Sequence, residues 1–296
     1  MDDRQPHPAP MARRFRQVDV FTSRAYCGNP LAVVLDGAGL STHDMERFAR
    51  WTNLSETTFL LPPEQREADY RVRIFTSAAK SAATGESAYE LPFAGHPTLG
   101  SCHAWLEAGG TPQHDSIIVQ ECPAGLVAVR PMDHGLAFAA PPLVRSGTVE
   151  EALLERIAAV LHLKRSEILD AAWADNGPGC VAILLGSADA VLTLQPGAVD
   201  KEIGVIGPYP AGSPCAFEVR AFFPKDGATA EDPATGSLHA SLAQWLLRTG
   251  RAKPPYVASQ GTARGRSGRI HVTHDPEGSI WVGGGTVTCI SGDVHL

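Results

Sequence analysis

The sequence predicts an α+β protein with two pseudo-symmetric lobes, each a barrel-like curved sheet wrapped around a central buried helix. One observation is the number of short β-branched runs, among them QVDVF, YRVRIF, CVAILL and FEVRAFF. Pro, Gly and Asp separate these runs at short intervals, which is typical of a strand-rich fold. A second observation is that helical patterns are fewer, and two of them carry almost no charge. A helix that is apolar on nearly all sides is a buried helix.

An internal repeat predicts the two lobes. YRVRIFT followed by ELPFAGHPTLGSCHAWLEAGG in the first half resembles FEVRAFFPKDGATAEDPATGSLHASLAQWLLRTG in the second half. Each segment has a Val-Arg-x-Phe strand, an acidic residue (Glu90 or Glu231), a Pro/Gly turn and an almost uncharged helix that ends at glycine. The spacing from Gly95 or Gly236 to the closing glycine is the same in both. We therefore expect a duplicated strand–turn–helix unit.

Length and composition set the domain count and exclude several classes of partner. A chain of 296 residues is long enough for two domains, and we predict lobes over residues 14–132 and 133–296, with the last strand a candidate to cross back to the first lobe. The net charge of -7 argues against nucleic acid or an anionic membrane as a partner. No apolar run approaches the ~18 residues that span a bilayer. Six scattered cysteines without a CxxC pair favour reduced thiols in a cytoplasmic protein.

Two further helices are predicted from start signals. STHDMERFARWTN begins with Ser41 and Asp44 at the spacing of a capping box. TVEEALLERIAAVLHL begins with Thr148 and Glu151 at the same spacing. We therefore expect Ser41 and Thr148 to cap these helices.

The two uncharged helices, expected near residues 97–108 and 238–248, predict a ligand site. Buried helix N-termini carry backbone N–H groups without partners, and such groups readily bind an anion. Gly95 and Gly236 would bring bare backbone to a small carboxylate held in a cleft between the lobes, where ligand sites are common. Ser237 would add a backbone N–H and a hydroxyl, or would serve only as the helix N-cap.

Three side chains near these N-termini are candidates for chemistry. Glu56, where NLSE enters the strand TTFLL, is either an exposed carboxylate at a strand start or a buried general acid/base. His96 follows Gly95 and either caps the helix or titrates beside the bound anion. Asp232 in EDPATGS is placed as the counterpart of His96 at the second helix, although aspartate is also an ordinary helix-start residue.

The ordered motifs GNPLAVVLD, RWTNLSETTFLL, ELPFAGHPTLG and EDPATGSLHASLAQWL resemble the PhzF family of phenazine-biosynthesis isomerases over roughly residues 15 to 292. The later segments SQGTARGRSGRI and VGGGTV fit the same family. The resemblance implies the two-lobed fold of diaminopimelate epimerase and cofactor-free proton transfer on a small carboxylic acid. It also implies a homodimer, and it matches Glu56 to the catalytic glutamate of the family.

The sequence differs from the PhzF family by one insertion, and from epimerases of this fold by the lack of two cysteines. The Ala/Ser/Gly-rich stretch SAAKSAATGESAY, residues 77–89, is an insertion relative to the family and is interpreted as a surface loop or a mobile lid. Epimerases of this fold use one cysteine at each helix N-terminus, and here PFAGHP and DPATGS carry none. Two-thiol racemisation is therefore disfavoured. His96, His103 and His239 match no zinc spacing, and we expect neither a metal nor an organic cofactor.

Three functional hypotheses stay open from the sequence. The first is a cofactor-free isomerase that moves a proton with Glu56. The second is an amino-acid epimerase or racemase, which needs bases on two opposite faces. The third is a non-catalytic protein that binds a small metabolite in the same cleft.

Overall fold

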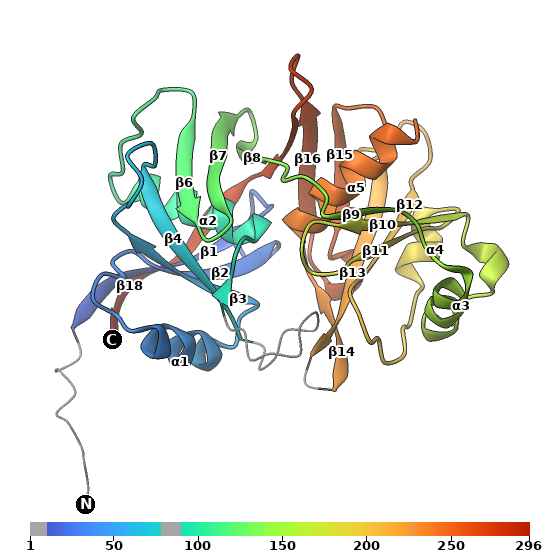
Figure 1. Cartoon of the computed structure of the whole chain (residues 1–296), viewed down its shortest axis with the longest axis horizontal. Helices are drawn as coiled ribbons and strands as arrows, with labels where there is room; N and C mark the ends of the chain where they lie inside the picture. Colours follow the sequence, from blue (N-terminus) through green and yellow to red (C-terminus); the bar gives the residue numbers. More distant parts are fainter. Residues whose placement is uncertain (1–10, 78–89, 226) are drawn as a thin grey trace, which may run out of the picture.

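The computed structural model describes residues 11–77, 90–225 and 227–296, and Figure 1 shows two lobes side by side. The strands and helices that begin the chain are β1 (Ala12–Val20), β2 (Asn29–Val34), α1 (Thr42–Thr52), β3 (Glu56–Leu61), β4 (Tyr70–Thr76), β5 (Glu90–Leu91), α2 (Gly95–Glu107), β6 (Ile118–Cys122), β7 (Gly125–Met132) and β8 (Gly135–Ala139). Those that follow are β9 (Arg145–Thr148), α3 (Glu151–Val160), β10 (Asp170–Asp175), β11 (Val181–Leu184), α4 (Ala188–Leu192), β12 (Ile203–Pro208), β13 (Phe217–Lys225), β14 (Ala228–Asp232), α5 (Gly236–Arg248), β15 (Tyr256–Gln260), β16 (Gly268–His274), β17 (Ile280–Gly284) and β18 (Thr286–His295).

The two lobes repeat one order of strand pairing. In the first lobe β1 and β2 are antiparallel, β2 and β3 parallel, β3 and β4 antiparallel, and β4 and β6 parallel. The same sequence of pairings joins β10, β11, β12, β13 and β15 in the second lobe. In each lobe a crossover helix, α1 or α4, follows the second of these strands. The α+β fold class with two similar lobes is confirmed.

Strands also cross between the lobes. β9 follows the first-lobe strands in the chain but pairs with β10, and β18 follows the second-lobe strands but pairs with β1 (Figure 1). β8 and β17 pair antiparallel with each other and join the two sheets. The proposed division at residues 132 and 133, just before β8, stays a prediction.

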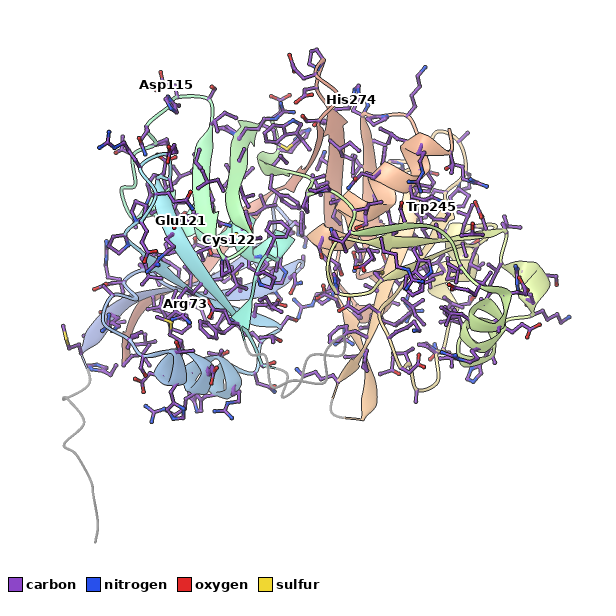
Figure 2. All side chains as sticks on the ribbon, viewed as in Figure 1. Arg73, Asp115, Glu121, Cys122, Trp245 and His274 are labelled. Atoms are coloured by element: carbon purple, nitrogen blue, oxygen red, sulfur yellow. The ribbon has the colours of Figure 1, made fainter. Side chains whose placement is uncertain are left out.

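Each lobe is built on one buried helix, as predicted. Along α2 the residues from Gly95 to Cys102 are all buried, and α5 buries most of its length. Trp245 of α5 is 2% exposed and lies inside the second lobe (Figure 2). Both helices begin two residues earlier than expected, at Gly95 and Gly236, so His96 and Ser237 belong to the first helical turns.

One of the two predicted helix caps is wrong. Ser41 caps α1, and its hydroxyl accepts the backbone N–H of Asp44 at 3.1 Å. Thr148 does not cap α3, because it ends β9 and pairs with Ala172 of β10. The N-cap of α3 is Glu150, whose side chain makes no capping hydrogen bond.

The insertion at residues 77–89 lies almost entirely outside the described residues, so the loop and lid interpretations both remain predictions. In the part of the chain that the structure describes, helices are all too short or too polar to cross a lipid bilayer.

Candidate active site

The N-termini of the two central helices touch each other. A Cβ atom placed on Gly95 would lie 2.8 Å from the Cα of Gly236, and one placed on Gly236 would lie 3.1 Å from the Cα of Gly95. No side chain fits at such distances, so glycine at both positions lets the two helices meet backbone to backbone. The meeting point lies between the lobes, where the sequence predicted a cleft.

Both helix N-termini present unpaired donors at this point. The described residues supply no acceptor for the backbone N–H groups of His96, Gly236 and Ser237, and neither helix has a side-chain cap. Two helix dipoles point their positive ends at the same place. The arrangement suits one small anion shared by both helices.

Glu56 and His96 lie beside this meeting point. Asn53 ends α1 in the left-handed conformation that asparagine tolerates, and the chain then enters β3 at Glu56. The Oε2 atom of Glu56 lies 3.2 Å from Nε2 of His96. The angles are not those of a hydrogen bond, and both atoms are left without a hydrogen-bond partner among the described residues.

Burial works against an ion pair between the two groups, because it disfavours the charged form of each. It lowers the pKa of His96 to about 3, so the imidazole is uncharged at neutral pH. It is also the largest cause of a raised pKa at Glu56, and the nearby charges of Asp232 and Glu202 raise that pKa further, against a smaller effect of Lys225. A carboxyl with a raised pKa can accept and return a proton near neutral pH. The Glu56 side chain is 16% exposed, although its Oε2 atom is buried.

Asn29 links His96 to Asp232. Its side-chain amide donates to the Oδ1 atom of Asp232 and to the carbonyl of Ala234, each at 2.9 Å. These two acceptors fix the orientation of the amide, which then places its NH₂ group 3.3 Å from Nδ1 of His96.

Thr235 and Gln260 also donate hydrogen bonds to Asp232, Thr235 to its carboxylate and Gln260 to its backbone carbonyl. The hydroxyl of Thr235 donates to Oδ2 of Asp232 at 2.6 Å. Burial raises the pKa of Asp232 to about 6, and the hydrogen bonds from Thr235 and Asn29 oppose this rise. Gln260 is fully buried and donates to the Asp232 carbonyl and to the Thr235 hydroxyl. Asn29 and Gln260 lie in motifs that indicate the family, GNPLAVVLD and SQGTARGRSGRI. The sequence alone did not predict a role for either residue.

All six predicted site residues lie at or beside the helix junction, but two details differ from the predictions. The N-cap of α5 is Thr235, so Ser237 is not the N-cap. Ser237 is the second residue of its helix, as His96 is of α2. Asp232 is therefore not the counterpart of His96. Ser237 holds that position, and Asp232 ends β14, four residues before α5 begins at Gly236.

Other predicted groups lie away from this chemistry. All six cysteines are free, and burial raises the pKa of Cys102 to about 12. His103 contacts Thr288 and Glu107, whereas His239 contacts Gln260. A surface cavity of about 650 Å³ is lined by Arg24, His134, Arg269 and neighbouring residues, and it includes none of the predicted site residues.

The chain matches known proteins over nearly its whole length. Residues 18–292 match the family model described as phenazine biosynthesis-like protein. The chain is 35% identical to "Antisense-enhancing sequence 1" of Schizosaccharomyces pombe, over 94% of this chain and 97% of that protein. It is 32% identical to trans-2,3-dihydro-3-hydroxyanthranilate isomerase of Pseudomonas aeruginosa, over 90% of this chain and 91% of that protein.

A solved structure supports the fold. The phenazine biosynthesis protein of the PhzF family from Bacillus anthracis superposes with a TM-score of 0.78 at 21% identity, covering 97% of this chain and 100% of that one. Other relatives of the chain, from Pasteurella multocida and Mesorhizobium japonicum, are also named isomerases. The resemblance that the motifs indicated is confirmed, and the chain belongs to the phenazine biosynthesis-like (PhzF) family, as an enzyme of the isomerase class.

Proposed function

We propose that the chain catalyses a cofactor-independent isomerisation in which a proton moves along the conjugated system of a small cyclic or amino carboxylic acid. Glu56 is the general acid/base. The observation that carries this proposal is the position of its carboxyl, 3.2 Å from the neutral imidazole of His96, where two buried helices join their N-termini.

The helix junction holds the carboxylate of the substrate. The two helices begin at Gly95 and Gly236, which touch each other, so the backbone N–H groups of Gly95, His96, Gly236 and Ser237 and the hydroxyl of Ser237 would bind it there. Asp232, oriented by Asn29 and Thr235, accepts a hydrogen bond from an amino or hydroxyl group of the same substrate. The bound molecule is thereby held at two points, which fixes its reacting carbon toward Glu56.

The proton transfer uses the raised pKa of Glu56. When the ionised carboxyl takes a proton from carbon, the C–H bond breaks and its electron pair enters the conjugated system. A proton then forms a new C–H bond at another carbon of that system. Nε2 of His96 lies 3.2 Å from Oε2 of Glu56, beside the carboxyl that takes the proton. Positioned acid–base groups of this kind typically contribute ~10²–10⁴-fold in rate.

The substrate class is proposed from the relatives. The Pseudomonas aeruginosa relative is named for trans-2,3-dihydro-3-hydroxyanthranilate, a cyclic amino carboxylate. That compound has the carboxylate, the amino group and the conjugated ring that the proposed site would engage. We also propose a homodimer on the family resemblance, and sedimentation equilibrium at twice the chain mass tests it.

Exchange in deuterated water tests the proposed function. The protein is treated with EDTA and incubated with a panel of trans-2,3-dihydro-3-hydroxyanthranilate and other cyclic and amino carboxylates, while NMR follows deuterium entering carbon positions. We expect at least one cyclic carboxylate to gain deuterium and to isomerise. Binding without exchange across the panel supports the non-catalytic hypothesis, and inversion of an amino acid at its α carbon supports the epimerase hypothesis.

A further inference from the structure

The strand register relates Glu56 to one other carboxylate in the chain. In the first lobe Phe75 pairs with Glu90 of β5 and with Thr57 of β3. In the second lobe Phe222 pairs with Glu231 of β14 and with Ile203 of β12. Thr57 and Ile203 are thus equivalent positions.

The residue before each of these positions is a glutamate, Glu56 in the first lobe and Glu202 in the second. The strand register also makes Asp19 and Asp175 equivalent, and both make the same kind of hydrogen bond. Asp19 of β1 accepts the backbone N–H groups of Cys27 and Gly28, and Asp175 of β10 accepts those of Gly177 and Gly179. The two lobes therefore place their glutamates by the same local framework.

The helix junction joins equivalent residues of the two lobes. Gly95 and Gly236 are equivalent and touch each other, which is the contact expected where a two-fold axis relates the lobes. Equivalent side chains lie on opposite sides of such an axis. We therefore expect a carboxylate bound at the junction to have Glu56 on one side and Glu202 on the other; the charge of Glu202 is close enough to act on Glu56.

Glu202 lacks the partners of a structural carboxylate. Its backbone carbonyl accepts the N–H of Val181, which fixes the strand. Its side chain is partly buried, and the described residues give its carboxyl neither a hydrogen bond nor an ion pair. Burial and the charges of Asp232 and Asp175 raise the pKa of Glu202 to about 8, so it holds its proton at neutral pH.

The site contains other buried polar atoms that point to a ligand. His96 is 4% exposed and Asn29 is fully buried, and each has one polar atom, Nε2 and Oδ1, without a hydrogen-bond partner among the described residues. The surroundings of the two glutamates also differ. Glu56 lies near Nε2 of His96 and feels the charges of Asp232 and Glu202 and, more weakly, the positive charge of Lys225, whereas Glu202 feels Asp232 and Asp175.

We infer that Glu202 is a second catalytic residue of this site, the acid that delivers a proton to the substrate on the side opposite Glu56. This inference rests on the proposed function. Ionised Glu56 takes the proton as one C–H bond breaks, and the electron pair moves through the conjugated system. At the far carbon that pair forms a new C–H bond with the proton of Glu202, which becomes a carboxylate. Glu56 then loses its proton to water and Glu202 gains one, which restores the starting state without any other reactant.

Separate measurement of exchange and of isomerisation tests the inference. The parent, Glu202→Gln and Glu56→Gln are incubated in deuterated water with trans-2,3-dihydro-3-hydroxyanthranilate, or with the panel compound that the parent isomerises. In Glu202→Gln we expect isomerisation to fall at least ~10²-fold, while deuterium still enters the recovered substrate through Glu56. In Glu56→Gln we expect both to be lost.

A control lies two residues away in the same loop. The side chain of Asp200 is 71% exposed and pairs with Arg156 on the surface, so Asp200→Asn is expected to keep both activities. The thermal midpoint of each variant is measured beside the rates. If Glu202→Gln does not fold, Glu202→Asp keeps the acid on a shorter arm and is expected to retain part of the isomerisation and all of the exchange.

The outcomes separate this inference from the proposed function. Isomerisation at the parent rate in Glu202→Gln, or equal loss of exchange and isomerisation in a variant that still binds, overturns the role of Glu202 and leaves Glu56 untouched. A parent that exchanges and isomerises nothing overturns the proposed function and the role of Glu202 with it.

Discussion

Gly95 and Gly236 touch backbone to backbone, and this contact joins the two central helices at their N-termini. The contact places the N-termini of both helices at one point between the lobes, where we propose that the substrate carboxylate binds. A methyl group on Gly95 would lie 2.8 Å from the Cα of Gly236, which leaves no room for it. The geometry of the junction therefore depends on glycine at both positions.

The first prediction follows from that contact. Gly95→Ala places a Cβ 2.8 Å from the Cα of Gly236, which the helices relieve only by moving apart. We expect a loss of about 1–3 kcal/mol in unfolding free energy and a clear loss of carboxylate affinity. Gly186→Ala is the control, since its Cβ would have no neighbour closer than 3.9 Å. Urea unfolding and calorimetry measure the two effects, and unchanged affinity in Gly95→Ala contradicts the shared site.

The second prediction concerns Asn29. Asn29→Ala removes the donor to Asp232 and to the Ala234 carbonyl, and it leaves both acceptors buried. Leaving a buried acceptor unpaired costs about 1–3 kcal/mol, so we expect a loss of that order in unfolding free energy and slower isomerisation. Gln113→Ala removes an exposed amide and serves as the control. Equal stability of the two variants would show that Asn29 does not hold Asp232.

The third prediction uses the pKa of Glu202, which burial raises from 4.5 to about 8. Because the folded state binds this proton more tightly than the unfolded state, the contribution of Glu202 to stability is complete below about pH 4.5. It is lost as the pH rises toward 8. Glutamine resembles the protonated carboxyl and does not titrate. Urea unfolding at several pH values is therefore expected to show a smaller loss of stability between pH 5 and pH 9 in Glu202→Gln than in the parent, and parallel curves would contradict the raised pKa.

The fourth prediction compares the two equivalent ion pairs. Arg73 with Glu90, and Arg220 with Glu231, form matching two-pronged pairs, whose Nε–Oε1 distances are 2.8 and 2.9 Å. Figure 2 shows Arg73 in the first lobe, where its pair is partly exposed, whereas the side chains of Arg220 and Glu231 are 6% and 11% exposed. Breaking a buried pair costs about 3–5 kcal/mol. We expect Glu231→Gln to approach this loss in unfolding free energy and Glu90→Gln to lose clearly less; the reverse order contradicts the burial argument.

Much of the fold could be predicted because the repeat is visible in the sequence. The Val-Arg-x-Phe strands and the uncharged helices predicted two lobes around two buried helices. The exchange of β9 and β18 between lobes could not be predicted in full, since strand pairing depends on partners far along the chain. The predicted cap at Thr148 failed because that residue is held in a strand by Ala172, and such tertiary pairing overrides a local signal.

Part of the candidate site could also be predicted from the repeat. Gly95, His96, Gly236 and Ser237 could be placed at one site because both helix starts were evident. Asn29 and Gln260 were not found, because a buried amide in an apolar segment shows its role only through partners from other elements. Glu202 could have been found by extending the repeat back to the strand before FEVRAFF. Glu202 directly precedes that strand, and Glu56 begins the equivalent strand of the first lobe.

The central claim is that Glu56 moves the proton while the helix junction holds the anion. Glu56→Gln keeps size and polarity but cannot take a proton, and Glu277→Gln, at an exposed glutamate, is the control. Calorimetry gives the affinity for the carboxylate that the parent turns over, and NMR in deuterated water gives the rate of exchange. We expect affinity near that of the parent and exchange at least ~10²-fold slower in Glu56→Gln, with both unchanged in Glu277→Gln. Exchange at the parent rate in Glu56→Gln would contradict the account.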